Sequence, residues 1–277
     1  MVQPQVSIVI PCYNHGHYLH DALESVKQCD AALYEVIIVN DGSTDTATID
    51  VLKELELQGY TVIHKPNGGL SSARNAGIAV AKGAYILPLD ADNKIRPEYL
   101  TESIRQFETD SEIGVVYGDA AYFGEKTGVW RVGGFNQQKL MLSNFIDACA
   151  VIRKSVFDQI GGYDTDLKNG LEDWEYWLRM SFAGFKFAYV NKVLFDYRVM
   201  NTSMSGELRQ NYLKRNSAIL AIEEKYKHKM GGDYVTGHIV TRFKKSPLLF
   251  IVKLAMKAWL PSVYDRLLKE NKIARGL

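Results

Sequence analysis

Residues 36–57 read VIIVNDGSTDTATIDVLKELEL, and this stretch decides the fold. Its first four residues form an apolar run of strand length. A helix is expected from about Thr46 to Leu57, with Ser43 or Asp45 as its cap. The same order of strand and helix recurs on either side, and alternating strands and helices form parallel βαβ units. The sequence therefore predicts an α/β fold with a Rossmann-like, mostly parallel central sheet flanked by helices.

The other predicted elements extend this pattern through the first half of the chain and then depart from it. In the first half we expect strands at residues 6–10, 60–64 and 85–89, and helices at residues 18–28 and 71–81. In the second half we expect helices at 97–108, 171–183 and 205–229, strands at 114–118 and 147–152, and a hairpin or mobile loop at 123–136. We therefore predict one continuous domain over residues 1–205 and C-terminal helices over residues 206–277.

The bulk composition narrows the classes of partner and compartment. The chain has 277 residues and a formal net charge of +1, which argues against nucleic acid as a partner, because phosphate binding leaves a clear basic excess. Cys12, Cys29 and Cys149 show no metal-ligand spacing and cannot all pair, which fits a reducing compartment. The N-terminus shows no signal-peptide pattern, and the longest apolar stretch, residues 248–260, is too short to cross a bilayer. We therefore expect a cytoplasmic protein.

Acidic residues follow two of the predicted strands at the points where those strands end. Asp41 follows the apolar run at residues 36–39, and the pair Asp90 and Asp92 follows the run at residues 85–89. Ligands bind beyond the carboxyl ends of parallel strands, where the loops converge on one crevice. Two carboxylates at i and i+2 on an extended segment point the same way and repel each other unless a divalent cation binds them. The alternatives are a common turn into a helix at Asp41 and an exposed acidic turn at Asp90.

Two further segments at the same predicted edge carry groups that suit a nucleotide. After the first strand, Pro11, Tyr13 and Asn14 form a turn in which the aromatic ring can stack on a nucleobase. Asn67 lies in a glycine loop that leads into a helix, and Arg74 in that helix can reach a phosphate or orient a carboxylate. The alternative for Arg74 is a solvent-exposed side chain in a surface ion pair.

A third acidic position lies far along the chain, where Glu172 and Asp173 precede Trp174 at the start of a predicted helix. A carboxylate that arrives from a separate segment can accept a proton from a reacting group. We expect the positive end of the helix dipole to stabilise the ionised form of Asp173. The alternative for the two carboxylates is helix capping.

Together these motifs resemble the family 2 inverting glycosyltransferases of A-type (GT-A) fold. The resemblance rests first on residues 6–14, 39–45, 69–75 and 90–92, which carry four motifs in the family's order. It continues through Gly161-Gly162-Tyr163-Asp164, Glu172-Asp173-Trp174 and Tyr197-Arg198, so it covers about residues 4–205. It implies a nucleotide-sugar half over about residues 1–95 and an acceptor half over about residues 96–205.

The resemblance implies a donor site for a nucleoside-diphosphate sugar, carried over position by position. Its residues are Pro11, Tyr13, Asn14, Asp41, Asn67, Arg74, Asp90 and Arg198. Within this set, Asp41 is expected to accept a hydrogen bond from the ring N–H of a uracil-type base. Arg74 is expected near the diphosphate, and Asp90 is expected to face the ribose and the sugar. Asp92 is expected to bind Mn²⁺ or Mg²⁺.

On the acceptor side, the resemblance makes Asp173 the catalytic base, with Glu172 and Trp174 supporting the acceptor. An inverting displacement needs one base, on the face opposite the leaving group, to deprotonate the acceptor hydroxyl as it attacks. It also needs a cation that stabilises the departing diphosphate. No covalent nucleophile is required.

The sequence thus predicts a metal-dependent hexosyl- or N-acetylhexosaminyltransferase that moves a sugar from a UDP-sugar to a saccharide or lipid-linked glycan, in polysaccharide or cell-envelope assembly. Met200 stands where family members often carry a His, and Arg198, Ser203 or Ser205 are candidates to cover part of the diphosphate instead. One alternative is a sugar nucleotidyltransferase, which would need a basic Gly-rich loop that residues 11–16 do not offer. The other is a non-catalytic nucleotide-sugar-binding scaffold, which the intact carboxylates disfavour.

The C-terminal segment differs in charge from the rest of the chain. Residues 242–277 hold nine Lys or Arg against two acidic residues. In residues 246–260 the apolar side chains leave Lys253 and Lys257 about one turn apart. Residues 242–260 are therefore predicted to form an interfacial helix on the inner face of an anionic membrane. The alternative is a helix that packs on the catalytic domain or on a second copy in a homodimer.

Overall fold

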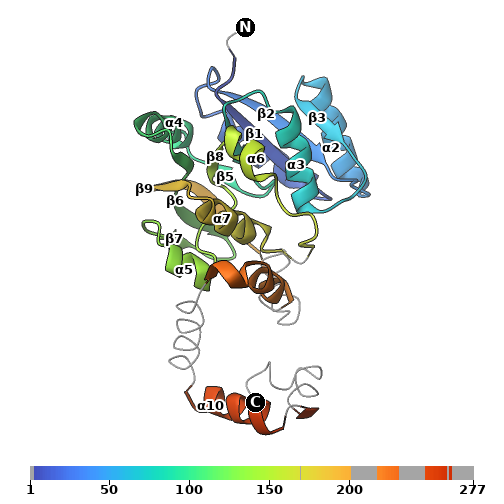
Figure 1. Ribbon diagram of the computed structural model, residues 1–277. Coiled ribbons are helices and arrows are strands. Elements are labelled where there is room, and N and C mark those ends of the chain that lie inside the picture. The colour runs from blue at the N-terminus through green and yellow to red at the C-terminus, as the bar shows by residue number, and fades with distance from the viewer. Residues whose placement is uncertain (1–2, 169, 201–216, 231–246, 261, 264–277) are drawn as a thin grey trace.

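Four parallel strands build the amino-terminal half of the molecule. The computed structural model describes residues 3–168, 170–200, 217–230, 247–260 and 262–263 (Figure 1). The four strands are β1 (Val6–Cys12), β2 (Tyr34–Asn40), β3 (Thr61–His64) and β4 (Tyr85–Pro88), in the sheet order β3-β2-β1-β4. Because each strand pairs in parallel with its neighbour, their carboxyl ends meet at one edge of the sheet. This confirms the predicted βαβ arrangement.

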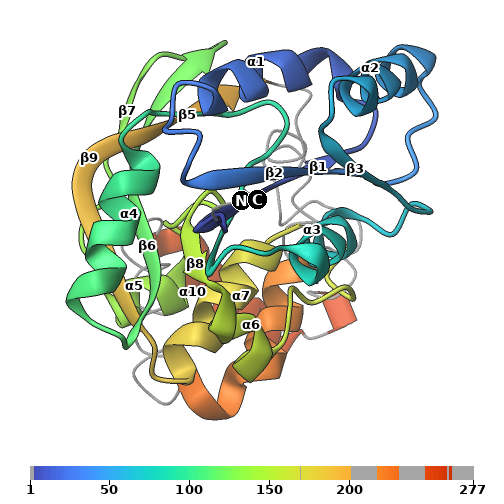
Figure 2. The same cartoon turned by 90° about the horizontal axis from the view of Figure 1, so that it is seen from above.

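Helices cover both faces of these strands (Figure 2). α1 (Gly16–Val26) and α2 (Thr46–Leu57) lie on one face, and α3 (Leu70–Val80) lies on the other. Successive side chains of β1 point to opposite faces of the sheet. Ile8 and Ile10 share a core with α1 and α2, whereas Val9 shares a core with α3. Asp45 caps α2 by accepting a hydrogen bond from the backbone N–H of Thr48, as the sequence predicts.

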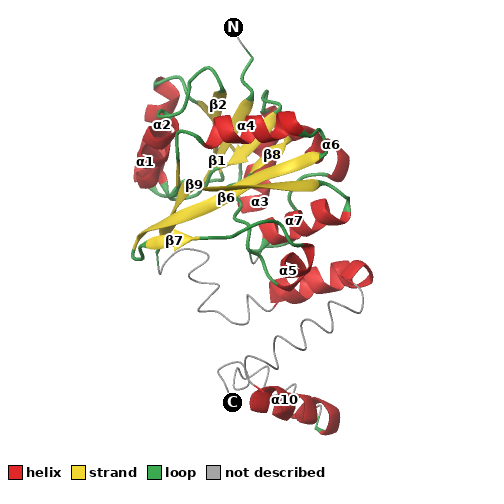
Figure 3. Cartoon of the chain, turned by 90° about the vertical axis from the view of Figure 1, so that its left-hand side faces the viewer, coloured by secondary structure: helices red, strands yellow, loops and turns green. Residues whose placement is uncertain are grey.

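The second half of the sheet is mixed, and two long strands dominate it. β6 (Ile113–Gly124) and β9 (Lys186–Val199) run in parallel side by side (Figure 3). β8 (Val151–Arg153) joins them to the first half by pairing antiparallel with both β4 and β6. β5 (Lys94–Ile95) pairs with β9, and β7 (Gly128–Trp130) pairs with β6 in the predicted hairpin. The described residues thus form one nine-stranded sheet.

Four helices surround this second half: α4 (Tyr99–Thr109), α5 (Gln137–Leu142), α6 (Lys154–Ile160) and α7 (Glu172–Phe182). The strand predicted at residues 147–152 is wrong in its start, since β8 begins only at Val151. Asp147 accepts a hydrogen bond from the N–H of Cys149 at 2.9 Å, which closes a turn instead of extending the strand. The segment between α5 and β8 is therefore a loop.

Most of the described part of the C-terminal region is helical. Residues 217–230 are helical, and Ile222 and Tyr226 from this helix share the core that contains α7. The predicted division at residue 205, and the start of the predicted long helix, lie outside the described residues. α10 (Pro247–Trp259) confirms the helix predicted near the C-terminus. No described helix is long and apolar enough to span a membrane.

Candidate active site

Asp41 lies at the carboxyl end of β2, and three hydrogen-bond donors surround its carboxylate. Lys65, at the end of β3, places Nζ 2.5 Å from Oδ1. The backbone N–H groups of Gly68 and Gly69 donate to Oδ1 and Oδ2 at 3.0 and 2.8 Å. A carboxylate offers about four acceptor positions. The three donors occupy three of these positions, so the carboxylate can accept one further hydrogen bond.

The turns around Asp41 are shaped by local backbone geometry. Gly42 has a φ of 72°, and a Cβ at this position would lie 2.6 Å from the backbone nitrogen of Asn67. Asn14 has a φ of 55°, and its Oδ1 accepts hydrogen bonds from two backbone N–H groups in the turn after β2. The Asn14 side chain therefore ties two loops together. Beside it, Pro11 is buried in β1, and the ring of Tyr13 is 47% exposed at the sheet edge.

Arg74 joins the two halves of the site. Its guanidinium donates to Asp90 Oδ1 and to Glu172 Oε1, both at 2.7 Å. Arg74 is only 1% exposed, so the alternative of a surface ion pair is wrong. Of the two roles that the sequence leaves open, the contacts match the orienting of carboxylates. A residue of α3 thereby fixes Glu172, which lies 98 positions further along the chain.

Asp92 lies beyond β4 beside Asp90, and Arg198 holds its backbone. The Arg198 Nε donates to the Asp92 carbonyl at 2.9 Å, and the other side of the guanidinium pairs with Asp21 at 3.0 Å. Arg198 is thus engaged with protein groups at the place where the sequence predicts a diphosphate contact. Burial, followed by the neighbouring Asp90, raises the pKa of Asp92 to about 6. The Met200 sulfur lies 2.9 Å from the hydroxyl of Tyr18.

Asp173 lies in the first turn of α7, and its two oxygens have different partners. Oδ2 accepts a hydrogen bond from Asn144 Nδ2 at 2.8 Å, and Oδ1 accepts one from the N–H of Trp174 at 2.8 Å. Burial, followed by the charges of Glu172 and Asp147, raises the pKa of Asp173 to about 8. The expectation that the helix dipole favours the ionised form is therefore outweighed by desolvation and by like charge. A carboxyl with this pKa is suited to accept a proton.

Reasoning from the sequence missed three residues of the site, one beside Asp41 and two near Asp173. Lys65 follows β3, so the rule for strand ends that found Asp41 also applies to it. Asn144 and Asp147 lie in the loop between α5 and β8, and no local pattern marks them.

Trp174 was expected beside the acceptor, but it is 3% exposed and its Nε1 donates to the Leu140 carbonyl at 2.6 Å. The structure thus places Trp174 in the packing of α7.

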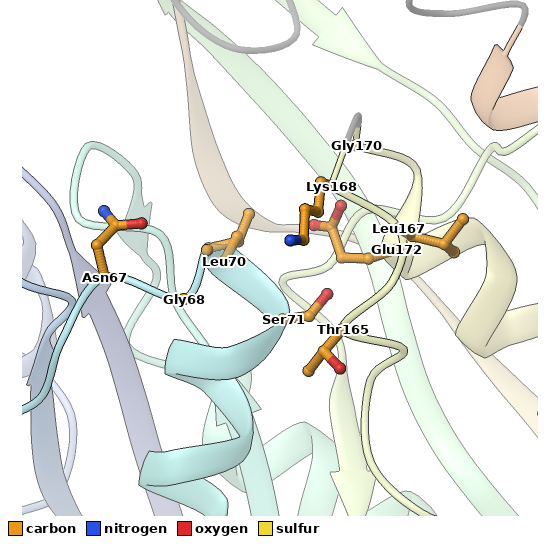
Figure 4. A pocket seen from close by; sticks show the side chains of 10 residues that line it. Asn67, Gly68, Leu70, Ser71, Thr165, Leu167, Lys168, Gly170 and Glu172 are labelled. Carbon is orange, nitrogen blue, oxygen red and sulfur yellow. The ribbon is translucent and has the colours of Figure 1, made fainter.

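A cavity of about 300 Å³ lies between the start of α3 and the loop that precedes α7 (Figure 4). Asn67 lies at one end, and Glu172 and Leu167 lie toward the other. Ser71 and Lys168 lie between them. The cavity therefore runs from the loop that donates to Asp41 to the carboxylate that pairs with Arg74. It is at the small end of the range for ligand pockets.

The sequence of this chain is similar to those of known glycosyltransferases. The family model described as Glycosyl transferase family 2 matches residues 7–161. The putative glycosyltransferase EpsH of Bacillus subtilis (strain 168) is 30% identical over 79% of this chain and 68% of its own length. The hyaluronan synthase of Pasteurella multocida is 28% identical over 78% of this chain. This chain spans only 22% of the length of that synthase.

Solved structures share the fold at low sequence identity. Residues 1–349 of TarS from S. aureus superpose with a TM-score of 0.63 and 17% identity, covering 87% of this chain and 73% of that one. The mannosyltransferase PcManGT from Pyrobaculum calidifontis, solved with GDP-Man and Mn²⁺, gives a TM-score of 0.61 and 16% identity, covering 98% and 84%. The curled, mostly parallel sheet flanked by helices is therefore a GT-A fold. With a family model matched over more than half of its length, the chain belongs to the family 2 glycosyltransferases.

Proposed function

We propose that this chain is an inverting glycosyltransferase that moves a sugar from a UDP-sugar to a hydroxyl of a saccharide or lipid-linked glycan. The observation that carries the proposal is the pair of ion pairs made by Arg74. They join Asp90, beside the donor edge of the sheet, to Glu172, the neighbour of Asp173. A nucleotide-binding edge and a carboxyl with a raised pKa thereby share one site, which is what a single displacement requires.

In the proposed mechanism the donor is held at the strand ends. The exposed ring of Tyr13 packs against the nucleobase, and Asp41 accepts a hydrogen bond from the base edge. Asp173 accepts the proton of the acceptor hydroxyl as that oxygen attacks the anomeric carbon. One displacement from the side opposite the diphosphate inverts that carbon. Support for this donor class comes from a TarS structure in complex with UDP-GlcNAc and from PcManGT in complex with GDP-Man.

A divalent metal ion, Mn²⁺ or Mg²⁺, fits the residues beside Asp90. Among the described residues, no side chain donates a hydrogen bond to the Asp92 carboxylate, which lies next to a second carboxylate. Carboxylate oxygens are the ligands that such ions prefer. The described residues hold no group of three or more metal-ligating side chains, so Asp92 would share the ion with the donor. When bound, the ion supplies positive charge that stabilises the leaving diphosphate.

The cavity beside Glu172 and the exposed side chains of α10 support the proposed acceptor and the proposed membrane contact. The 300 Å³ cavity beside Glu172 suits a single sugar unit, which supports a hexosyl or N-acetylhexosaminyl group as the part transferred or received.

In α10, Leu248, Ile251 and Trp259 are exposed, which supports contact of residues 242–260 with an anionic membrane during glycan assembly. Co-sedimentation of the full chain with anionic liposomes should exceed that of a chain ending at residue 244. Equal pelleting would reject membrane contact, and a dimer in solution would favour packing between copies.

Nucleotide binding and transfer can be tested separately. Thermal unfolding should show that UDP with Mn²⁺ stabilises the chain, and UDP release from a panel of UDP-sugars should identify the donor. D173N should keep the stabilisation by UDP and lose transfer by at least about a hundredfold. D158N, which changes an exposed aspartate in α6, is the matched control and should behave as wild type. If D173N abolished UDP binding as well, Asp173 would be a donor ligand and not the base.

A further inference from the structure

We propose that Asn144 is a positioning residue for Asp173, which it holds in place and whose ionised, proton-accepting form it favours. The inference rests on the proposed role of Asp173 as the base. Asn144 lies 29 residues before Asp173, in the loop between α5 and β8. Neither the comparisons nor the family motifs assign it a role.

The orientation of the Asn144 amide is set by a second contact. Its Oδ1 accepts the backbone N–H of Ile146 at 3.3 Å, so Nδ2 is left facing Asp173 Oδ2 at 2.8 Å. A flipped amide would place oxygen against carboxylate and would lose both hydrogen bonds. Asn144 is therefore presented to the carboxylate as a donor.

Two indoles fix the loop that carries Asn144 to the helix that carries Asp173. Trp174 Nε1 donates to the Leu140 carbonyl at 2.6 Å, and Trp177 Nε1 donates to the Ile146 carbonyl at 3.0 Å. Both indoles are buried, with 3% and 0% exposed. Asn144 lies between these two anchor points in the chain, so the two hydrogen bonds restrain the position of its amide relative to the Asp173 carboxylate. This is the support that a precisely placed base requires.

The charges around Asp173 show why a neutral donor matters there. Glu172 on α7 and Asp147 in the same loop as Asn144 disfavour a charged Asp173, whereas Arg74 on α3 favours it. The hydroxyl of Tyr163 also lies within its electrostatic reach. Among the described residues, Asn144 is the one side chain that donates a hydrogen bond to Asp173. A hydrogen bond to the ionised form favours that form, so Asn144 opposes the effect of burial.

The substitutions N144A and N144D test whether Asn144 positions Asp173 or only packs beside it. N144A should lower kcat for UDP release about 10- to 100-fold, with little change in the KM for the donor. The rise of kcat with pH should move to higher pH, because the lost donor no longer favours the ionised base. N144D keeps the shape of Asn144 but sets two carboxylates together, which then share a proton. It should therefore move the pH profile at least as far as N144A.

The control is Q137A, which removes a different side-chain hydrogen bond to α7. Gln137 Nε2 donates to Ser181 Oγ at 2.9 Å, between α5 and α7 but away from Asp173. Q137A should leave the pH profile of kcat unchanged. If N144A also left it unchanged, or if N144D were as active as wild type, Asn144 would only fill space and the inference would be wrong.

A second measurement needs no turnover, so it separates this inference from the proposed function. The unfolding temperature of each Asn144 variant is compared with that of the same variant carrying D173N, between pH 5 and pH 9. The gain in unfolding temperature from D173N should rise with pH in both backgrounds. It should rise more when Asn144 is Ala than when Asn144 is present, because loss of the Asn144 donor raises the pKa of Asp173 further. Equal growth would overturn the inference even in an active enzyme. Failure of any nucleotide sugar to react would instead reject the proposed function.

Discussion

Two carboxylates at opposite ends of the site lie in opposite surroundings. Asp41, at the end of β2, is met by the ammonium group of Lys65 and by two backbone N–H groups. Asp173, at the start of α7, is met by one side-chain amide and lies near two other carboxylates. At the donor edge, which is the proposed nucleotide site, the carboxylate is thus held by three hydrogen-bond donors. At the α7 end, burial and like charge raise the pKa of the carboxyl to about 8, which suits its proposed role as a base.

Arg74 joins these two regions, so its replacement should have the largest effect. R74M leaves Glu172 buried without its cation, and breaking a buried ion pair costs about 3 to 5 kcal/mol. Urea unfolding should show this loss, and transfer should fall below detection. R105A removes an exposed arginine from its pair with Glu102, which keeps its second partner Lys192, and should change the free energy of unfolding by less than about 1 kcal/mol. Similar losses in the two variants would contradict a structural role for Arg74.

The pH dependence of stability should then distinguish the α7 end from the donor edge. The pKa of Asp173 is raised to about 8, so the folded protein keeps a proton that the unfolded chain loses above roughly pH 4. The contribution of Asp173 to stability therefore falls as pH rises from about 4 through 8. D173N should be more stable than wild type by roughly 1 to 3 kcal/mol at pH 9, and by less at pH 5. Thermal unfolding without ligand measures this, and a difference independent of pH would contradict it.

At the donor edge, D41N should weaken binding of UDP without altering the pH profile of catalysis. Asn cannot form the ion pair with Lys65, and a hydrogen bond to a charged group contributes about 1.5 to 3 kcal/mol. We expect UDP with Mn²⁺ to bind about 10- to 100-fold more weakly in calorimetry. N144A is the counterpart from the other region and should bind UDP as wild type does. Equal losses in the two variants would mean that the regions are not separate in function.

The smallest effect is expected for Y13A. The ring is 47% exposed, so its removal should leave the unfolding temperature nearly unchanged. It should weaken UDP binding by about 1 kcal/mol, or about fivefold, through lost contact with the base. Calorimetry with UDP and with inorganic diphosphate separates the base contact, because only UDP binding should change. A matching loss for diphosphate would place Tyr13 elsewhere than at the base.

Much of the donor edge could be predicted because its residues are tied to strand ends. Asp41 and Asp90 each follow an apolar run, and parallel strands bring such positions to one edge whatever the remaining chain does. The arrangement of β1, β2 and β4 is confirmed for the same reason. The roles assigned to individual side chains in ligand binding stay predictions.

At the α7 end, the sequence predicts the position of the two carboxylates at a helix start but not the side chains that surround them. Glu172 and Asp173 were placed at a helix start, yet the like charges that raise the pKa of Asp173 depend on Asp147, from a loop expected to be a strand. Arg74 was expected near a diphosphate, and its pairing with Glu172 links residues 98 positions apart. Periodicity and capping patterns describe neighbours in sequence, so they carry no information about such contacts.

By itself, the sequence determined the α/β class, the membership of glycosyltransferase family 2 and the carboxylates at the strand ends, because each of these depends on local periodicity and on ordered motifs. Only the tertiary structure decided which charges meet. Arg74 is shared between Asp90 and Glu172, and Asn144 is presented to Asp173. Burial strengthens each of these interactions because little water remains to screen them, and burial is a property of the packed molecule and not of any one segment.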